Sequence, residues 1–162
     1  MSETRDTAGV IAPPPLLALA ALVLGLLLDW LAPAYVLYVL LSTTERIIIG
    51  VVLMAAGGAL AVPAIRAFRS AGTHVEPWKP ALALATTGVY AYVRNPMYVG
   101  LTLLLVGLGI AFASDWTLVT TVAFALTIHF GVVLREERYL EAKFGEPYRQ
   151  YTARVPRYGL PI

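Results

Sequence analysis

Cysteine is absent from this chain, and histidine and charged residues are scarce. The 162 residues include no cysteine, two histidines and 14% charged residues. Disulfide bonds, thiolate catalysis and cysteine-ligated metal sites are therefore excluded. His74 and His129 lie far apart and have no companion at ligand spacing, so we expect no metal site.

Dense positive charge is also missing. The formal net charge is only +2, and Lys and Arg stand beside apolar segments instead of forming a continuous run. Proteins that bind nucleic acid cluster these residues to neutralise phosphates. We therefore expect no nucleic-acid partner.

Apolar residues, in contrast, are abundant and form four long runs. They make up 59% of the chain, against about 45–50% in soluble domains. The runs 14–31, 47–65, 97–113 and 116–134 are each close to the length that crosses roughly 30 Å of hydrocarbon. We predict an all-α, polytopic membrane protein with about four transmembrane helices. The acidic residues Glu3 and Asp6 precede the first run, which argues against a cleaved signal peptide because those begin with positive charge.

The positive charges predict an orientation. Most of the twelve Lys and Arg residues lie in two segments, residues 66–94 and 135–157. With four helices, both segments and both termini fall on one side of the membrane. The positive-inside rule makes that side cytoplasmic. We therefore expect a multi-pass protein with cytoplasmic N- and C-termini, in the inner membrane if the source is bacterial.

Residues 88–100 have an unusual composition for a membrane boundary, with tyrosines around an Arg-Asn-Pro sequence. Pro96 disfavours helical backbone at Asn95 and can itself begin a helix. The free backbone N–H groups of a helix start attract anionic groups. With Tyr90 and Tyr98 they suit a polar, partly anionic, planar ligand. The alternative for the tyrosines is an aromatic belt at the membrane interface.

Ionisable residues also gather where the fourth apolar run ends. Glu136 and Glu137 begin a charged continuation of that helix, which we expect to stop around Gly145. His129 precedes Glu136 by seven residues, two helical turns, so both should share a face. Ionisable groups at this depth are often functional. The alternatives are a solvated collar of charges at headgroup level and a structural role for His129.

Several short motifs follow one another in a fixed order, with a helical hairpin between them: Gly88-Val89-Tyr90, Arg94-Asn95-Pro96-Met97-Tyr98-Val99-Gly100, Glu136-Glu137 with Leu140, Phe144-Gly145-Glu146-Pro147-Tyr148, Tyr151, and Arg154-Val155-Pro156. In this order they resemble the isoprenylcysteine carboxyl methyltransferase and phospholipid methyltransferase superfamily of integral membrane enzymes. The resemblance covers about half of the chain, from roughly residue 72 to residue 156. The chain has no G-x-G-x-x-G motif, so it does not contain a soluble Rossmann-type methyltransferase.

The resemblance implies S-adenosyl-L-methionine as methyl donor, with S-adenosyl-L-homocysteine as product, bound on the cytoplasmic side by the C-terminal half. The residues that it assigns to the cofactor site are Tyr90, Arg94, Asn95, Pro96, Met97, Tyr98, Glu136, and the segment Leu82, Ala83, Leu84 and Ala85. We expect a single domain, residues 1–162, in which residues 1–69 supply two helices and residues 70–162 form the cofactor-binding half.

The sequence does not decide the identity of the methyl acceptor. Prenylcysteine enzymes of eukaryotes usually have histidine where Asn95 stands, and an arginine where this chain has Val132. The resemblance implies a lipophilic or membrane-associated acceptor that offers a carboxylate, an amine or a thiol. An amine or thiol requires a general base, for which the candidates are His129, Glu136 and Glu137. The alternative function is a non-enzymatic four-helix membrane adaptor or small transporter subunit, which would pack through the glycines of its helices and bind anionic lipid through its basic tail.

Overall fold

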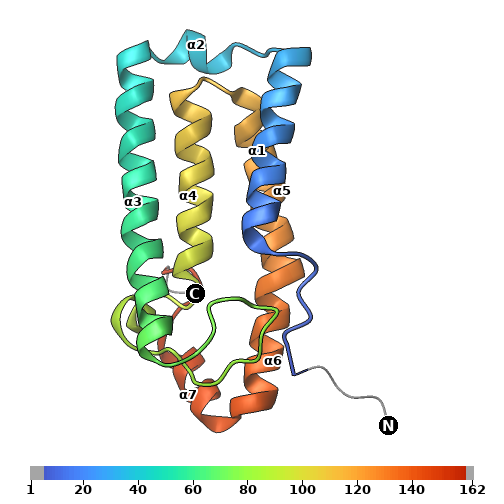
Figure 1. The fold of residues 1–162 in the computed structure, drawn as a ribbon. Helices are drawn as coiled ribbons and strands as arrows, with labels where there is room; N and C mark the ends of the chain where they lie inside the picture. Colours follow the sequence, from blue (N-terminus) through green and yellow to red (C-terminus); the bar gives the residue numbers. More distant parts are fainter. Residues whose placement is uncertain (1–5, 160–162) are drawn as a thin grey trace.

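A computed structural model describes residues 6–159, and within that range the chain forms helices and no strands. Four of them, α1 (Pro14–Leu31), α3 (Thr43–Ser70), α4 (Pro96–Ala111) and α5 (Asp115–Ile128), run side by side as a bundle (Figure 1). The predicted all-α fold is confirmed. The chain reverses after α1 through the short helix α2 (Val36–Leu40), which lies across one end of the bundle.

Three segments are long and apolar enough to cross a membrane: α1, α3, and the continuous helical stretch Asp115–Phe144. Helix α4 is apolar but has only 16 residues, about 24 Å at 1.5 Å per residue. Three of the four expected spans therefore have the required length. The third apolar run was expected to stay helical to residue 113, but its helix ends at Ala111.

Local sequence signals start and stop these helices. The Ser42 side chain accepts a hydrogen bond from the Glu45 N–H, and the Glu45 carboxylate accepts one from the Ser42 N–H. This capping box begins α3. Ser114 caps α5 in a similar way through the N–H of Thr117. Pro14 and Pro96 stand in the first turns of α1 and α4, where their missing N–H costs nothing.

Two pairs of glycines bring α3 and α4 into backbone contact. A Cβ atom on Gly57 would lie 2.6 Å from the carbonyl oxygen of Gly100, and one on Gly50 would lie 2.6 Å from that of Gly107. Small residues allow such approach in membrane helices. Gly58, the next residue of α3, has nothing within 4 Å of its Cβ position. The close packing fixes the position of α4, whose first turn begins the candidate site.

The fourth apolar helix continues as predicted, but its middle is not α-helical. Between α5 and α6 (Leu134–Phe144) lies a π-helical turn, η2 (His129–Val133). At the end of α6, Gly145 has φ +59°, and helix α7 (Glu146–Arg154) begins there. No helix was predicted after Gly145, although Pro147 in the first turn and the Tyr148–Tyr151 spacing suit a helix with one buried face.

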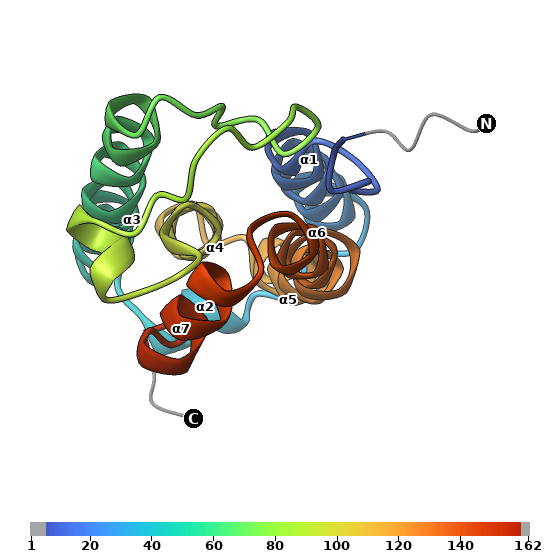
Figure 2. The ribbon, with the colours of Figure 1, turned by 90° about the horizontal axis from the view of Figure 1, so that it is seen from below.

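The segment between α3 and α4 covers the end of the bundle opposite α2. Figure 2 shows it running from α3 toward α1 and α6 and then returning to α4. It contains one regular element, the 3-10 turn η1 (Gly88–Ala91). Together with α6 and α7, this segment encloses a cavity at that end.

Candidate active site

The cavity lies where the start of α4, the inner face of α6, helix α7 and the α3–α4 segment meet. Its volume is about 100 Å³. Its lining is largely aromatic and apolar and includes the carboxylates of Glu136 and Glu137. Elements from distant parts of the sequence therefore form one site.

The N-terminus of α4 faces this cavity through Met97 and Tyr98. Asn95 precedes the helix with φ −125° and ψ 51°, outside the helical region, as Pro96 predicts. The first N–H groups of a helix have no partner within it and carry partial positive charge. Met97 and Tyr98 thus present donors suited to an anionic group.

Tyr98 and Glu136 form the central polar contact. The Tyr98 hydroxyl donates a 2.7 Å hydrogen bond to a Glu136 carboxylate oxygen. Tyr98 is only 8% exposed and packs in the apolar core with Leu105, Ile128 and Val132. Because its ring is fixed by this packing, the hydroxyl holds Glu136 in one position, which leaves the other carboxylate oxygen available to a ligand.

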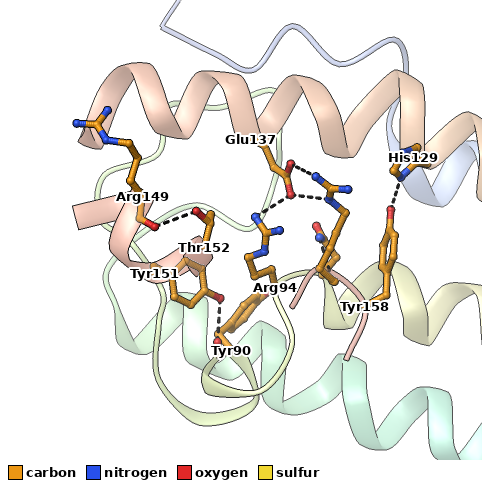
Figure 3. Close-up of polar contacts among 10 residues, drawn as sticks. Tyr90, Arg94, His129, Glu137, Arg149, Tyr151, Thr152 and Tyr158 are labelled. Carbon is orange, nitrogen blue, oxygen red and sulfur yellow. Dashed lines mark hydrogen bonds and ion pairs between the residues drawn. The ribbon is translucent and has the colours of Figure 1, made fainter. Parts of the chain in front are cut away.

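Glu137 has different surroundings. Arg157 donates to both of its carboxylate oxygens, with distances of 2.8 and 2.6 Å, and Arg94 approaches at 3.0 Å (Figure 3). The backbone reinforces this cluster, since the N–H of Asn95 donates to the carbonyl of Arg157 and that of Arg94 donates to Pro156. Glu137 therefore ties the C-terminal segment to the start of α4.

Three tyrosines form the aromatic wall. The Tyr151 hydroxyl donates a 2.8 Å hydrogen bond to the carbonyl of Tyr90, which joins α7 to η1 (Figure 3). Burial raises the pKa of Tyr148 to about 12, and the nearby Glu137 charge contributes to that shift. Burial also raises the pKa of Tyr90 and of Tyr151. All three hydroxyls are neutral at physiological pH, so this wall offers aromatic surface and no negative charge.

The structure brings most of the predicted cofactor residues together. Those that line the cavity are Tyr90, Arg94, Asn95, Met97, Tyr98, Glu136, Ala83, Leu84 and Ala85, and Glu137 joins them. Pro96 is fully buried behind the wall, and Leu82 is 61% exposed and lies outside the lining.

His129 is not brought to this cavity. It was expected to share a helix face with Glu136, but a π turn holds more residues than an α turn. The seven residues from His129 to Glu136 therefore span less than two full turns, and the two side chains do not share a helix face. His129 lines a second cavity and forms a 2.8 Å hydrogen bond with Tyr158.

Other residues of the site were missed in the sequence. Tyr139 lines the cavity, and its hydroxyl accepts a hydrogen bond from Ala81 N–H and donates to Asp6. Ala8 from the N-terminal segment and Phe68 at the end of α3 also reach the cavity. Only the spacing of Tyr139, three residues after Glu136, could have placed it near the site. The contributions of Ala8 and Phe68 depend on the folded chain.

Comparison with known protein sequences assigns the chain to a family. The sequence model of the phospholipid methyltransferase family matches residues 45–147, which include α3, the α3–α4 segment, and the helices that carry Tyr98 and Glu136. The chain belongs to the phospholipid methyltransferase family. The matched region holds both halves of the central polar contact.

Relatives of this phospholipid methyltransferase family member occur in a yeast and a bacterium. A protein-S-isoprenylcysteine O-methyltransferase of Schizosaccharomyces pombe is 38% identical over 82 residues, which are 49% of this chain and 33% of that protein. An uncharacterized protein of Haemophilus influenzae is 36% identical over 62 residues, 38% of this chain and 98% of that protein. The match thus spans about a third of the length of the yeast relative. No solved structure gives a significant match.

Proposed function

We propose that this protein is an integral membrane methyltransferase that uses S-adenosyl-L-methionine to methylate a lipophilic, membrane-associated acceptor. The observation that carries the proposal is the cavity in which the Tyr98–Glu136 pair faces the N-terminus of α4. Both residues of the pair lie within the region that matches the phospholipid methyltransferase family. The relative from S. pombe, a protein-S-isoprenylcysteine O-methyltransferase, supports a methyl acceptor of lipophilic character.

The chemistry of the lining suits this cofactor. S-Adenosyl-L-methionine combines a carboxylate, an ammonium, a sulfonium and an adenosine. The N–H groups at the start of α4 and the Arg94 guanidinium suit the carboxylate. The free oxygen of Glu136 suits a cationic group or the ribose hydroxyls. Ala83, Leu84 and Leu140 offer apolar surface for the adenine ring.

The cavity is smaller than the pockets that usually hold a small molecule. Its volume of about 100 Å³ is below the roughly 300–1,000 Å³ of pockets that hold small molecules. Binding therefore requires residues 76–85 to move outward. Few polar contacts resist that motion: Ala81 N–H donates to Tyr139, and Leu82 N–H donates to Thr73. The later part of the α3–α4 segment stays in place, because Tyr90 is bonded to α7 and residues 94–95 to the C-terminal segment.

The bound sulfonium supplies an already electrophilic methyl group, so no covalent catalyst is needed. The protein has to align donor and acceptor and exclude water. Glu136 is assigned to cofactor binding, and Glu137 is assigned to structure because Arg157 and Arg94 occupy its oxygens. Of the three candidate bases, His129 then remains for an amine or thiol acceptor, from the neighbouring cavity, while His74 lines the cofactor cavity itself. A carboxylate acceptor would need none.

In this proposal α4 completes a set of four membrane spans with both termini on the cytoplasmic side. Residues 1–69 supply α1 and α3, and residues 70–162 form the cofactor-binding half of a single domain. Eleven of the twelve Lys and Arg residues would then be cytoplasmic, and Arg46 alone would lie at the other face. The short α4 fits because its first turn begins at a polar cavity instead of in lipid.

Binding of S-adenosyl-L-homocysteine to the detergent-purified protein, measured by calorimetry, tests this function. We expect saturable binding that Glu136→Gln weakens about 10- to 100-fold, since a hydrogen bond to a charged group contributes about 1.5–3 kcal/mol. Glu141→Gln is the matched control, because Glu141 stands on the same helix with its side chain 53% exposed. A folded wild-type protein that does not bind would overturn the function and favour the adaptor alternative. Equal affinity in Glu136→Gln would overturn the site.

A further inference from the structure

A third cavity, of about 260 Å³, lies at the α2 end of the bundle, opposite the candidate active site (Figure 1). It is enclosed by the end of α1, the segment that leads into α2, and the turn that joins α4 to α5. Leu26 and Phe112 line it and are 45% and 69% exposed. The cavity therefore opens on the apolar outer face of the bundle, near the level where the membrane spans end.

Aromatic side chains form much of its lining. Besides Phe112, the rings come from Trp30, Tyr35 and Tyr38, which are 78%, 58% and 58% exposed. The centroids of the two tyrosine rings lie 6.1 Å apart, and the ring planes are inclined by 58°. Aromatic rings that surround a small space bind alkylammonium groups through their π faces. The lining therefore suits such a group.

The cavity also contains a carboxylate. Asp29 accepts a hydrogen bond from the Ser114 hydroxyl with one oxygen, and a long one of 3.4 Å from the Trp116 N–H with the other. Asp115, at the same end, is instead occupied by the first N–H groups of α2. Within residues 6–159 Asp29 has no ion-pair partner. An ammonium group in the cavity would supply that counter-charge.

Arg46 carries the opposite charge beside this cavity. Its guanidinium lies 4.2 Å from the centroid of the Tyr38 ring, and its Nη2 donates to the Thr43 hydroxyl at 3.0 Å. Among residues 6–159 its buried Nε has no hydrogen-bond partner, and no carboxylate pairs with it. Arg46 would repel a lone cation, and Asp29 would repel a lone anion. The two charges together favour a ligand that carries both signs.

Backbone geometry distinguishes the same place. Tyr35 and Ala113 are the two non-glycine residues of the described range with positive φ, at 62° and 53°, and both line this cavity. Left-handed backbone is unfavourable for residues with a Cβ atom, and it clusters at functional sites. One of these turns places the Tyr35 ring in the lining, and the other precedes Ser114, the partner of Asp29.

We propose that this third cavity binds the headgroup of a zwitterionic phospholipid, with the ammonium group between the aromatic rings and Asp29 and the phosphate toward Arg46. The volume is just below the roughly 300–1,000 Å³ of small-molecule pockets, so it suits a headgroup and not a whole lipid. The acyl chains would lie along the exposed apolar surface of α1 beside Leu26. The site is separate from the cofactor cavity and does not rest on the proposed function.

Native mass spectrometry of the full-length protein in detergent tests the assignment by counting retained lipids. The probe is phosphatidylcholine, and phosphatidylglycerol with the same acyl chains is the comparison because its headgroup has no ammonium. We expect one phosphatidylcholine per protein, bound about tenfold more tightly than phosphatidylglycerol. Trp30→Leu should weaken that binding about 3- to 30-fold. Tyr92→Leu is the matched control, because Tyr92 is 77% exposed and lies at the opposite end of the bundle.

Asp29→Asn is the second variant, since it removes the charge and keeps the size of the side chain. We expect it to weaken phosphatidylcholine binding about tenfold or more. Equal retention of the two lipids, or undiminished binding of phosphatidylcholine in both variants, would overturn the site and leave an ordinary aromatic belt. Free phosphocholine that displaces the lipid at equal concentration would overturn the membrane as the source of the ligand.

Discussion

Glu136 and Glu137 are adjacent in the chain, yet their carboxylates have different partners. Glu136 accepts one hydrogen bond from a neutral tyrosine hydroxyl and faces the cavity. Glu137 is bound by the guanidinium groups of Arg94 and Arg157. A carboxylate with one free oxygen can bind a ligand, whereas one enclosed by two cations is suited to hold segments together. The two residues therefore have separate roles.

Replacing Glu137 should affect stability first. Glu137→Gln leaves Arg94 and Arg157, which are 12% and 24% exposed, without a counter-charge. We expect a loss of about 3 kcal/mol in the free energy of unfolding, as for other partly buried ion pairs that lose one partner. Thermal or denaturant unfolding in detergent measures it, with Glu141→Gln as the exposed control. Removing Arg157 as well should recover part of the loss, and no difference between the single variants would contradict the structural role.

At the scale of elements, the α3–α4 contact decides where the site is built. The Gly50–Gly107 and Gly57–Gly100 pairs place the two backbones in contact along the length of α4. The first turn of α4, with Tyr98, is therefore held at a fixed height beside α3. The π turn η2 has a comparable effect on the other side, because it turns Glu136 toward Tyr98 and His129 toward the second cavity.

Neighbouring glycines of α3 should respond in opposite ways to alanine. In Gly57→Ala the new Cβ would lie 2.6 Å from the Gly100 carbonyl oxygen, which forces the helices apart at a cost of about 1–3 kcal/mol. In Gly58→Ala the Cβ meets nothing within 4 Å, and the better helix propensity of alanine should add up to about 1 kcal/mol. Unfolding free energies of both variants in the same detergent give the comparison. Equal effects would show that the contact does not contribute to stability.

At the scale of the whole molecule, the two ends of the bundle differ in charge. The α2 end carries Arg46, Asp29 and Asp115, and the Asp115 carboxylate accepts hydrogen bonds from the N–H groups of Val36 and Leu37. The opposite end carries the Arg94–Glu137–Arg157 cluster and the charged helices α6 and α7. The positive-inside rule predicts the orientation of the protein from this difference in charge.

The absence of cysteine allows a direct test of orientation. Single cysteines are introduced at Leu40 on α2 and at Ala153 on α7, both exposed. In intact cells we expect a membrane-impermeant maleimide to label Leu40→Cys, and Ala153→Cys only after permeabilisation. The cysteine-free parent protein gives the background. The reverse pattern would place the candidate site outside the cytoplasm.

The sequence by itself determined the features that depend on neighbouring residues. Interactions between neighbouring residues predicted the four apolar runs, the helix start at Pro96 and the stop at Gly145, because caps and breakers act within one turn. The resemblance in motif order around Tyr98 and Glu136 was enough to predict a little under half of the residues that line the cavity. The helix within the C-terminal segment was missed because its signals are weaker than its tertiary contacts with Tyr90 and Glu137.

Only the tertiary structure decided which side chains face one another. The π turn separated His129 from Glu136, although their spacing predicts a shared face in an ideal helix. The distant Arg157 and Arg94 gave Glu137 a structural role, and Tyr98 became the wall between two cavities. These outcomes depend on contacts between residues up to 63 positions apart, as in Arg94 and Arg157 joined through Glu137. Such contacts exist only once the helices have packed, so no periodicity or local motif encodes them.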